Sequence, residues 1–359
     1  MNGALSPGAT IGILGAGQLG RMLATAAARL GFRVHTFSPE TSPPAAQVAA
    51  HHVPAAYDDE DALAAFAEGV DAATFEFENI PPQTVSFLRD RGVPVRPDDK
   101  VLAVCQDRLA EKAFLEAQGI VPAPHAQVDG RSDLEAALAR LGPDAILKTR
   151  RFGYDGKGQK RLSADTPLGA VDDLLTQPCV LEQKVPFTAE FSVIGARGEA
   201  GDVAFYEPSR NDHAGGILRR STVPASLPPA PLAAAQAAVR NCLMSLDYVG
   251  VLAVEFFWGE ETGLIANEMA PRVHNSGHWT HEACLTSQFE QHIRAVAGWP
   301  LGLTDRHSDA VMENILGAEV DDWARLAGTP GLAVTLYGKA DQRPGRKMGH
   351  TVRLSPKRG

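Results

Sequence analysis

Long apolar runs and paired cysteines are both missing from this sequence of 359 residues. No stretch of about 18 apolar residues occurs, which excludes a membrane-spanning helix. The first ten residues lack a basic stretch followed by an apolar one, so we expect no secretory signal. The four cysteines, Cys105, Cys179, Cys242 and Cys284, form no Cys-x-x-Cys pair. Such wide spacing is typical of idle thiols in a reducing compartment. We therefore expect a cytoplasmic protein.

An excess of positive charge is missing too. The net charge of −9 argues against nucleic acid as a partner, because a nucleic-acid binder normally shows a basic excess or a basic face. Hydrophobic residues at 44% and charged residues at 21% are ordinary for a globular protein. The chain is longer than a usual single core, so we expect two or three domains.

The first hundred residues alternate between short apolar stretches and longer amphipathic ones. Such alternation predicts an α/β domain, a parallel sheet with helices on both faces, that ends near residue 100. The predicted strands are 10–14, 32–37, 72–77 and 93–95, and the predicted helices reach from a glycine run to residue 30, then 59–68 and 82–91.

The remainder of the chain mixes both element types without a repeat or a low-complexity segment. Helices are predicted at 107–118, 231–246 and 282–297. Strands are predicted at 145–148, 180–183, 191–195, 203–206, 249–258, 263–268 and 333–337.

A first glycine run, Gly15-Ala16-Gly17-Gln18-Leu19-Gly20, lies between a predicted strand and a predicted helix. Backbone N–H groups at such a helix start can approach an anion closely. A dinucleotide site would also need an acid at the end of the next strand, and that strand ends at Ser38 instead. A small phosphate-bearing substrate or a purely structural turn therefore fits better than a nicotinamide cofactor.

A second glycine-rich run resembles a mobile loop over a triphosphate, with three glycines for flexibility and one lysine for charge. Lys148, at the end of a predicted strand, is able to reach phosphate oxygens as a point charge. The pattern is not a Walker A loop, and the alternative is an exposed hairpin turn, since Asp-Gly favours turns. The run is Gly153-Tyr154-Asp155-Gly156-Lys157-Gly158-Gln159.

The segment Glu182-Gln183-Lys184-Val185 has two interpretations. It could be an edge strand with solvated charges. It could instead be an adenine site, in which main-chain groups contact the base and Glu182 or Glu190 accepts from ribose hydroxyls.

Two carboxylates are the strongest candidates in the sequence for metal ligands. Glu255 and Glu268 each stand in an apolar stretch, where an unpaired carboxylate would be costly to bury. A hard cation such as Mg²⁺ that bridges phosphate oxygens would resolve the cost, and so would a buried arginine or lysine. Donors for a second, anionic ligand follow directly, namely Arg272, His274, Asn275 and Ser276. Zinc at His274, His278 and His281 is weakly supported, because the spacing is loose and no cysteine accompanies them.

The C-terminal segment is basic after an otherwise acidic chain. Lys339 and Arg346 are candidates for a phosphate clamp, in which fixed cationic groups hold a monoester. The alternative is a solvated tail.

Taken in order, these motifs resemble the ATP-grasp superfamily and, within it, the 5-(carboxyamino)imidazole ribonucleotide synthases of purine biosynthesis. The sequence departs from the usual family pattern at Val273, where proline is common, and at Phe152, where a small residue is common. Neither departure removes a donor or a metal ligand. The segments that carry the resemblance are 13–22, 74–79, 106–108, 153–159, 267–268, 274–280 and 345–350.

The resemblance implies three domains: an α/β domain over 1–105, a two-lobed α+β ATP-grasp unit over 106–296 and a small C-terminal domain over 297–359. It implies ATP bound by Arg108, Lys148, residues 153–159, Glu182, Gln183, Lys184, Val185, Glu190, His213, Asn267 and Glu268. It implies Mg²⁺ on Glu255 and Glu268. It implies the ribonucleotide near Gln18, Glu76, Asn79, Tyr154, Asp155, Arg272, Lys339 and Arg346. It implies catalytic roles for Lys148, Arg272, His274, Asn275 and Ser276.

The implied reaction joins bicarbonate to the exocyclic amine of 5-aminoimidazole ribonucleotide, and a homodimer is expected. Bicarbonate is a poor electrophile, so transfer of the γ-phosphoryl group to form carboxyphosphate would activate it. A closing loop would keep water from that labile species. Another ATP-grasp ligase, such as a formate-using glycinamide ribonucleotide transformylase or a biotin carboxylase, would share the ATP site. A nicotinamide-dependent dehydrogenase is the alternative from another class.

Overall fold

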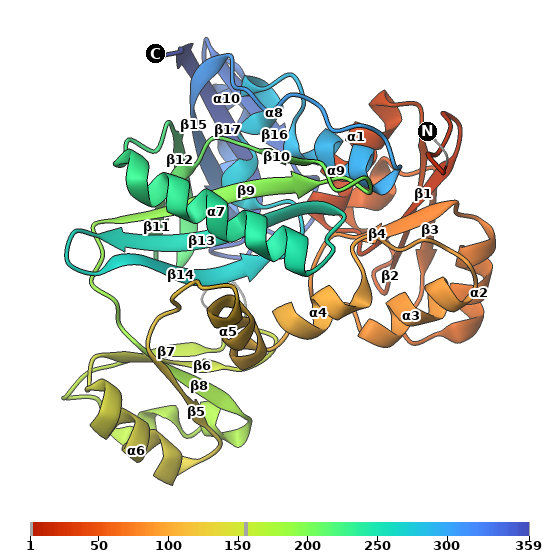
Figure 1. Cartoon of the computed structure of the whole chain (residues 1–359). Coiled ribbons are helices and arrows are strands. Elements are labelled where there is room, and N and C mark those ends of the chain that lie inside the picture. The colour runs from red at the N-terminus through yellow and green to blue at the C-terminus, as the bar shows by residue number, and fades with distance from the viewer. Residues whose placement is uncertain (1–2, 154–156, 359) are drawn as a thin grey trace.

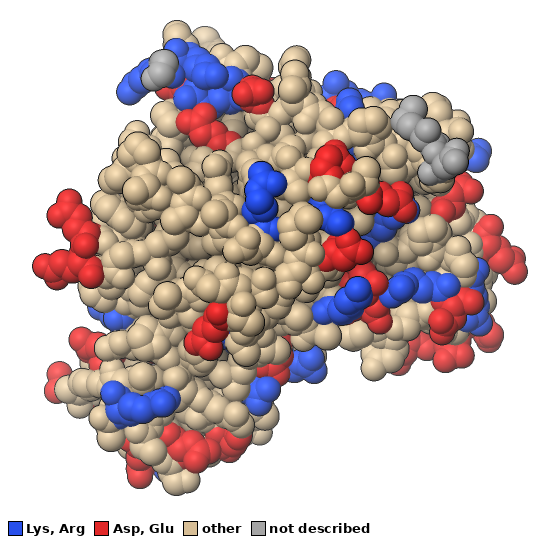
Figure 2. All heavy atoms as spheres, in the orientation of Figure 1, with Lys and Arg blue, Asp and Glu red and all other residues tan. Residues whose placement is uncertain are grey.

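The computed structural model describes residues 3–153 and 157–358 and contains three sheets (Figure 1). One sheet belongs to the N-terminal residues, a small second sheet carries the glycine-rich loop, and a large third sheet occupies the centre. No helix in the described part of the chain is long and apolar enough to cross a bilayer. On the face of Figure 2, acidic and basic side chains are intermixed, mainly around the periphery.

The N-terminal sheet is parallel, with the strand order β3-β2-β1-β4, as the alternating sequence predicted. Its strands are β1 (Thr10–Leu14), β2 (Arg33–Ser38), β3 (His51–Pro54) and β4 (Ala72–Phe75), and its helices are α1 (Gln18–Arg29), η1 (Pro44–Gln47), α2 (Glu60–Glu68) and α3 (Pro82–Asp90). Two predictions need correction. No strand was predicted at β3, and predicted strand 93–95 makes only an isolated bridge, Ala73 to Val95.

The small sheet is antiparallel, with the order β5-β8-β6-β7, and α6 (Arg131–Leu141) packs on it. Because β8 lies between β5 and β6, the interpretation of Glu182–Val185 as an edge strand is wrong. The strands are β5 (His125–Val128), β6 (Ala145–Thr149), β7 (Gln159–Leu162) and β8 (Cys179–Gln183), followed in the same lobe by η2 (Leu168–Val171) and η3 (Leu174–Thr176).

The large sheet has nine strands, and the C-terminal strands extend it rather than forming a sheet of their own. The link is the antiparallel pairing of β12 with β15, for example Thr222 with Val311. The order is β14-β13-β9-β11-β12-β15-β17-β16, with β10 paired to β9. The strands are β9 (Ala189–Arg197), β10 (Val203–Phe205), β11 (Ser209–Ala214), β12 (Ile217–Val223), β13 (Gly250–Gly259), β14 (Gly263–Ala270), β15 (Ser308–Leu316), β16 (Leu332–Leu336) and β17 (Lys347–Pro356).

The remaining helices join and cover these sheets, and α7 crosses the front of the large sheet in Figure 1. The predicted single helix 282–297 is instead two helices separated by Cys284–Ser287, because the Ser287 side chain accepts from the Glu290 amide and starts a new helix there. The helices are α4 (Asp99–Cys105), α5 (Arg108–Ala117), α7 (Pro229–Ser245), η4 (Asn275–Gly277), α8 (Thr280–Ala283), α9 (Gln288–Val296), η5 (Gly317–Asp322) and α10 (Trp323–Ala327).

A single apolar core connects the N-terminal domain to both halves of the large sheet. Leu23 of α1, Ile293 of α9 and Met312 of β15 belong to one buried cluster. A polar contact reinforces this junction, because buried Thr74 and His292 lie 2.7 Å apart (Oγ1 to Nε2). The N-terminal domain is therefore held firmly against the large sheet.

Candidate active site

Two adjoining cavities lie where the three sheets approach one another. The first, here called the N-terminal cavity, has a volume of about 450 Å³ and is lined by Gln18, Glu76, Asn79 and Arg272 among others. The second, the inter-sheet cavity, has a volume of about 810 Å³ and lies between the small and large sheets. The two share a wall, and the residues that line both are Arg108, Glu268, His274, Asn275 and Lys347.

A buried charged group forms one wall of the inter-sheet cavity. Glu182 of β8 contacts Lys148 of β6 (Nζ to Oε2, 2.7 Å) and Lys112 of α5 (Nζ to Oε1, 3.1 Å). Burial alone would raise the pKa of Glu182, but the two lysines and Arg108 outweigh it and lower the pKa to about 2. With two lysines and one carboxylate, the group carries a net positive charge that suits phosphate oxygens.

A second charged group on the large sheet faces the same cavity. Ligand atoms of Glu190, His213 and Glu255 lie within 4.8 Å of one another, on β9, β11 and β13. Burial and the neighbouring carboxylates Glu268 and Glu190 raise the pKa of Glu255 to about 8. Burial alone would lower the pKa of His213, but its 2.9 Å contact with Glu190 raises it. Keeping both carboxylates ionised so close together is costly without a further cation.

The start of α5 contacts three parts of the site. Asp107 makes a bidentate ion pair with Arg150, at the root of the glycine-rich loop. The other contacts go to β14 and β8: Arg108 lies 3.4 Å from Glu268 (Nη1 to Oε2), Glu111 accepts from the Met269 amide at 2.5 Å, and Lys112 pairs with Glu182. Residues 107–112 thereby contact both the small sheet and the large sheet, which form the two sides of the inter-sheet cavity.

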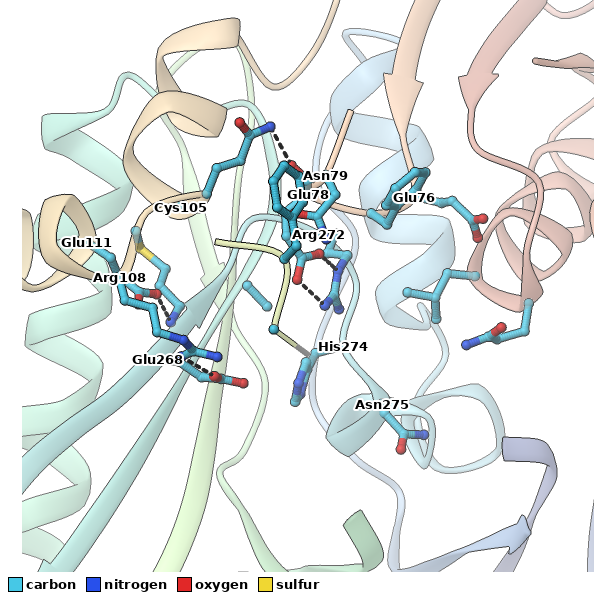
Figure 3. Close-up of a pocket in the computed structure, with 18 of the residues that line it drawn as sticks. Glu76, Glu78, Asn79, Cys105, Arg108, Glu111, Glu268, Arg272, His274 and Asn275 are labelled. Carbon is cyan, nitrogen blue, oxygen red and sulfur yellow. Dashed lines mark hydrogen bonds and ion pairs between the residues drawn. The ribbon is translucent and has the colours of Figure 1, made fainter. Parts of the chain in front are cut away.

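The predicted metal ligands Glu255 and Glu268 do not share one set of neighbours in this structure. Glu255 lies with Glu190 and His213, whereas the Glu268 carboxylate turns to Arg108 (Figure 3). Asn267, which precedes Glu268 on β14, lies 3.5 Å from Glu255 of β13 (Nδ2 to Oε2). Both carboxylates line the inter-sheet cavity.

The first glycine run holds a carboxylate of the protein itself. Glu76, which follows β4, accepts hydrogen bonds from the backbone amides of Gly17 and Gly20. Gly15 is required in this turn, because its φ is +95° and an added Cβ would lie 2.5 Å from the Glu76 Cγ. The anion-binding amides are therefore occupied, which excludes the dinucleotide interpretation in this conformation.

Arg272 lies in the N-terminal cavity, held by Glu78 (Figure 3). The two side chains form a bidentate pair with distances of 2.6 Å (Nε to Oε2) and 3.0 Å (Nη2 to Oε1). Burial would raise the pKa of Glu78, but Arg272 outweighs it and lowers the pKa.

His274 lies at the shared wall, and its two successors support it. Its Nδ1 lies 2.8 Å from Ser276 Oγ, and its Nε2 lies 3.6 Å from Glu255 Oε1. Burial and the nearby cations, Arg272 first among them, keep its pKa well below the usual value, so the imidazole is neutral. Ser276 is fully buried, and Asn275 exchanges two hydrogen bonds with Asn314. Ser276 therefore supports the site from behind.

Several predicted residues line the inter-sheet cavity as expected, and others do not. Lys339 donates to the Lys347 carbonyl, Arg346 pairs with Asp341, and neither lines the N-terminal cavity or the inter-sheet cavity in this conformation. Gly153 lines the N-terminal cavity, and Tyr154, Asp155 and Gly156 lie outside the described residues. The inter-sheet cavity is also lined by Lys157, Gln159, Gln183, Lys184 and Val185, whereas Gly158 turns beside Thr149 with a φ of +68°.

The motifs did not point to several charged residues in or beside these walls, among them Glu78, Glu111, Lys112 and Lys347. Glu111 and Lys112 stand three and four positions after Arg108, the spacing that puts side chains on one helix face, so this signal was available. Lys347 follows Arg346 in the basic segment, and its sequence context does not distinguish it from its basic neighbours. Glu78 lies two positions after Glu76. The Glu76 carboxylate contacts the glycine run, and the Glu78 carboxylate contacts Arg272.

Comparison with known proteins defines the class. Residues 113–289 match the ATP-grasp domain, residues 8–106 the ribonucleotide synthetase preATP-grasp domain, and residues 310–358 the phosphoribosylaminoimidazole carboxylase C-terminal domain. The fold and the two-lobed cavity with its lysines and carboxylates are thus those of an ATP-grasp ligase.

Full-length relatives define the family. The chain is 49% identical over 356 residues to N5-carboxyaminoimidazole ribonucleotide synthase of Brucella melitensis, covering 98% of each protein. It is 45% identical to the enzyme of that name from Pseudomonas aeruginosa, covering 95% of this chain and 93% of the relative. The chain belongs to the N5-carboxyaminoimidazole ribonucleotide synthases, the family that the sequence motifs resembled. It is an ATP-dependent ligase that carboxylates 5-aminoimidazole ribonucleotide in purine biosynthesis.

Solved structures agree with this assignment. An ADP complex of an N5-carboxyaminoimidazole ribonucleotide synthetase matches with a TM-score of 0.95 at 38% identity, covering 99% of this chain and 94% of that one. The Aspergillus clavatus synthase in complex with ADP and 5-aminoimidazole ribonucleotide matches with a TM-score of 0.89 at 27% identity, covering 98% and 94%.

Proposed function

We propose that ATP occupies the inter-sheet cavity and the ribonucleotide the N-terminal cavity, so that the γ-phosphoryl group lies at their shared wall. The observation that supports this most directly is the shared wall itself, because Arg108, Glu268 and Lys347 line both cavities. Two substrates bound on either side would meet there without crossing solvent. Such positioning lets a labile intermediate pass from one to the other.

The residues around the inter-sheet cavity fit the parts of ATP. Lys148 and Arg108 provide cations for phosphate oxygens, and Lys157 of the glycine-rich loop lines the same cavity. Glu182 and Gln183 end β8, Lys184 and Val185 follow it, and all four line the cavity, which supports the adenine site. Glu190 and His213 are the candidates for the ribose hydroxyls, because the Glu182 carboxylate is already bound by two lysines.

Mg²⁺ fits the carboxylates of this cavity. Glu255 and Glu268 would hold it, with Asn267 beside them, because oxygen donors of this kind are the ligands that Mg²⁺ prefers. The raised pKa of Glu255 supports the assignment, since a cation would remove the repulsion between the carboxylates. When bound, the cation neutralises charge on the β- and γ-phosphates. The Glu268 carboxylate would then bind the cation instead of Arg108, and the Arg108 side chain would be available to contact phosphate.

The residues of the shared wall fit the carboxylation step. Arg272 and neutral His274 would hold bicarbonate as its hydroxyl oxygen attacks the γ-phosphorus. The bond from the γ-phosphorus to ADP breaks, the hydroxyl proton passes to water, and carboxyphosphate forms. The amine of the ribonucleotide then takes the carboxyl carbon, phosphate leaves, and the amine loses one proton. Asn275 and Ser276 fix the neighbouring loop. The ribonucleotide would contact Gln18, Glu76, Asn79, Tyr154, Asp155, Lys339 and Arg346.

An ADP-release assay tests this function. We expect ADP release to require 5-aminoimidazole ribonucleotide and bicarbonate together, and glycinamide ribonucleotide to give no response. Equal turnover with glycinamide ribonucleotide, or turnover without bicarbonate, would contradict the proposal and favour the formate-using rival. Mg-ATP, but not a dinucleotide, should also raise the melting temperature.

We also propose a cytoplasmic homodimer. All four cysteines are described and free, which supports a reducing compartment. The dimer rests on family resemblance, and sedimentation equilibrium would test it.

A further inference from the structure

The Arg272 guanidinium is held along one edge by a carboxylate that no substrate role explains. Glu78 accepts from Nε and Nη2 of Arg272, and the Val273 carbonyl accepts from Nη1 at 3.3 Å. The two side chains come from segments 194 positions apart in the sequence, and both are mostly buried, with side-chain exposures of 18% and 24%. A bidentate pair of this kind fixes the plane of a guanidinium as well as its position.

The main chain of Glu78 is itself held in place. Gln106, at the end of α4, donates from Nε2 to the carbonyl of Glu78 at 2.8 Å and to the carbonyl of Ile80 at 2.6 Å. Both carbonyls belong to the loop that follows β4. An amide with two hydrogens can satisfy two carbonyls at once, whereas a carboxylate or an apolar side chain cannot. Gln106 therefore holds the main chain from which the Glu78 side chain extends.

We propose that Glu78 is a positioning residue for Arg272, and that Gln106 acts through Glu78. The proposal rests on the proposed contact between Arg272 and bicarbonate. A guanidinium free to rotate would still attract the anion, but it would no longer hold carboxyphosphate in line with the amine. A misplacement of about 1 Å costs on the order of a hundredfold in rate. Carboxyphosphate that misses the amine reacts with water and returns as bicarbonate and phosphate, so ATP is consumed without product.

A structural ion pair predicts a different result. If Glu78 and Arg272 only hold the N-terminal domain to the large sheet, losing the pair lowers the melting temperature and leaves the ratio of product to ADP near one. A positioning pair lowers that ratio even when the variant is fully folded. The ratio therefore separates the two roles.

The experiment compares Glu78→Gln with Glu207→Gln at saturating ATP, bicarbonate and ribonucleotide. Glu207 is a matched control, because it makes a similar bidentate pair with Arg306 (2.5 and 3.3 Å) and lines neither cavity. We expect Glu78→Gln to lower the carboxylation rate about ten- to hundredfold, with a smaller fall in ADP release and with the KM for ATP changed less than about twofold. Glu207→Gln should keep the wild-type ratio of product to ADP.

A double-mutant cycle tests the link to Gln106. Gln106→Met keeps the length of the side chain and removes both donors, so we expect it to lower the ratio of product to ADP as Glu78→Gln does. In the Glu78→Gln background it should have little further effect, because residues that act in series are not additive. Additive effects would overturn the role of Gln106.

Each outcome bears on one claim only. If wild-type enzyme shows no bicarbonate-dependent carboxylation, the proposed function fails. If the wild type is active and Glu78→Gln keeps a ratio near one, the positioning role fails. Should Glu78→Gln not fold, Glu78→Asp takes its place, because it keeps the charge but shortens the reach to Arg272.

Discussion

Removal of the Arg346 side chain should weaken ribonucleotide binding without affecting ATP. In this structure Arg346 contacts the Asp341 carboxylate at 3.0 Å, with side-chain exposures of 32% and 51%. An exposed ion pair of that kind contributes about 0–1 kcal/mol. A charge-assisted contact with the ribonucleotide phosphate contributes about 1.5–3 kcal/mol. Because the contact with phosphate replaces the contact with Asp341, substitution by alanine should cost roughly 0.5–3 kcal/mol of ribonucleotide binding, a rise of about two- to 140-fold in KM.

The control comes from the same loop. Arg343 pairs with the same Asp341 carboxylate at 2.5 Å but is more exposed, at 66%. Steady-state ADP release, with one substrate varied at a time, gives both constants for Arg346→Ala and Arg343→Ala. We expect only Arg346→Ala to raise the ribonucleotide KM, and both to leave the KM for ATP unchanged. An unchanged ribonucleotide KM in Arg346→Ala, or an equal rise in Arg343→Ala, would refute the clamp.

Three further results are expected. Glu255→Gln and Glu268→Gln should each lower Mg-ATP turnover by orders of magnitude while circular dichroism stays native, because each removes a charge from the cation site; near-normal turnover in both would contradict it. Gly17→Ala should raise the ribonucleotide KM about tenfold with little change for ATP, because its Cβ would lie 2.7 Å from Glu76 Oε1 and displace that carboxylate; equal rises for both substrates would speak against a local effect. Burial lowers the pKa of His292 to about 4. The contribution of His292 to the free energy of unfolding is therefore complete above about pH 6.5, and roughly 3 kcal/mol is lost as pH falls towards 4. His292→Gln should flatten this pH dependence in urea titrations, and parallel pH profiles for the variant and the wild type would count against it.

Local patterns predicted the fold of the N-terminal domain well. The strands and helices there follow one another in sequence, so periodicity and turn residues carry most of the information. The break between α8 and α9 at Ser287 was not predicted. It depends on one capping residue, whereas the apolar pattern continues across it. The joining of β12 to β15 could not be read from either strand, because the pairing depends on where the long connection between them returns.

For the site, sequence motifs supplied the side chains but not their partners. Glu182 was recognised as part of the nucleotide segment, yet its two lysines come from different elements, one of them 70 positions earlier in the chain. Glu78 and Arg272 are further apart still, and no spacing rule connects them. Such pairs follow only from the packing of three sheets.

The short segment that opens α5 has a consequence for how far the domains can be exchanged between proteins. The match to the preATP-grasp domain ends at residue 106 and the match to the ATP-grasp domain begins at residue 113, so the contacts of Asp107, Arg108, Glu111 and Lys112 lie in neither. A chimera joined within this interval would keep both folds while losing ion pairs on both sides of the inter-sheet cavity. Recombination of such enzymes should therefore succeed only when the segment and the ATP-grasp unit come from the same parent.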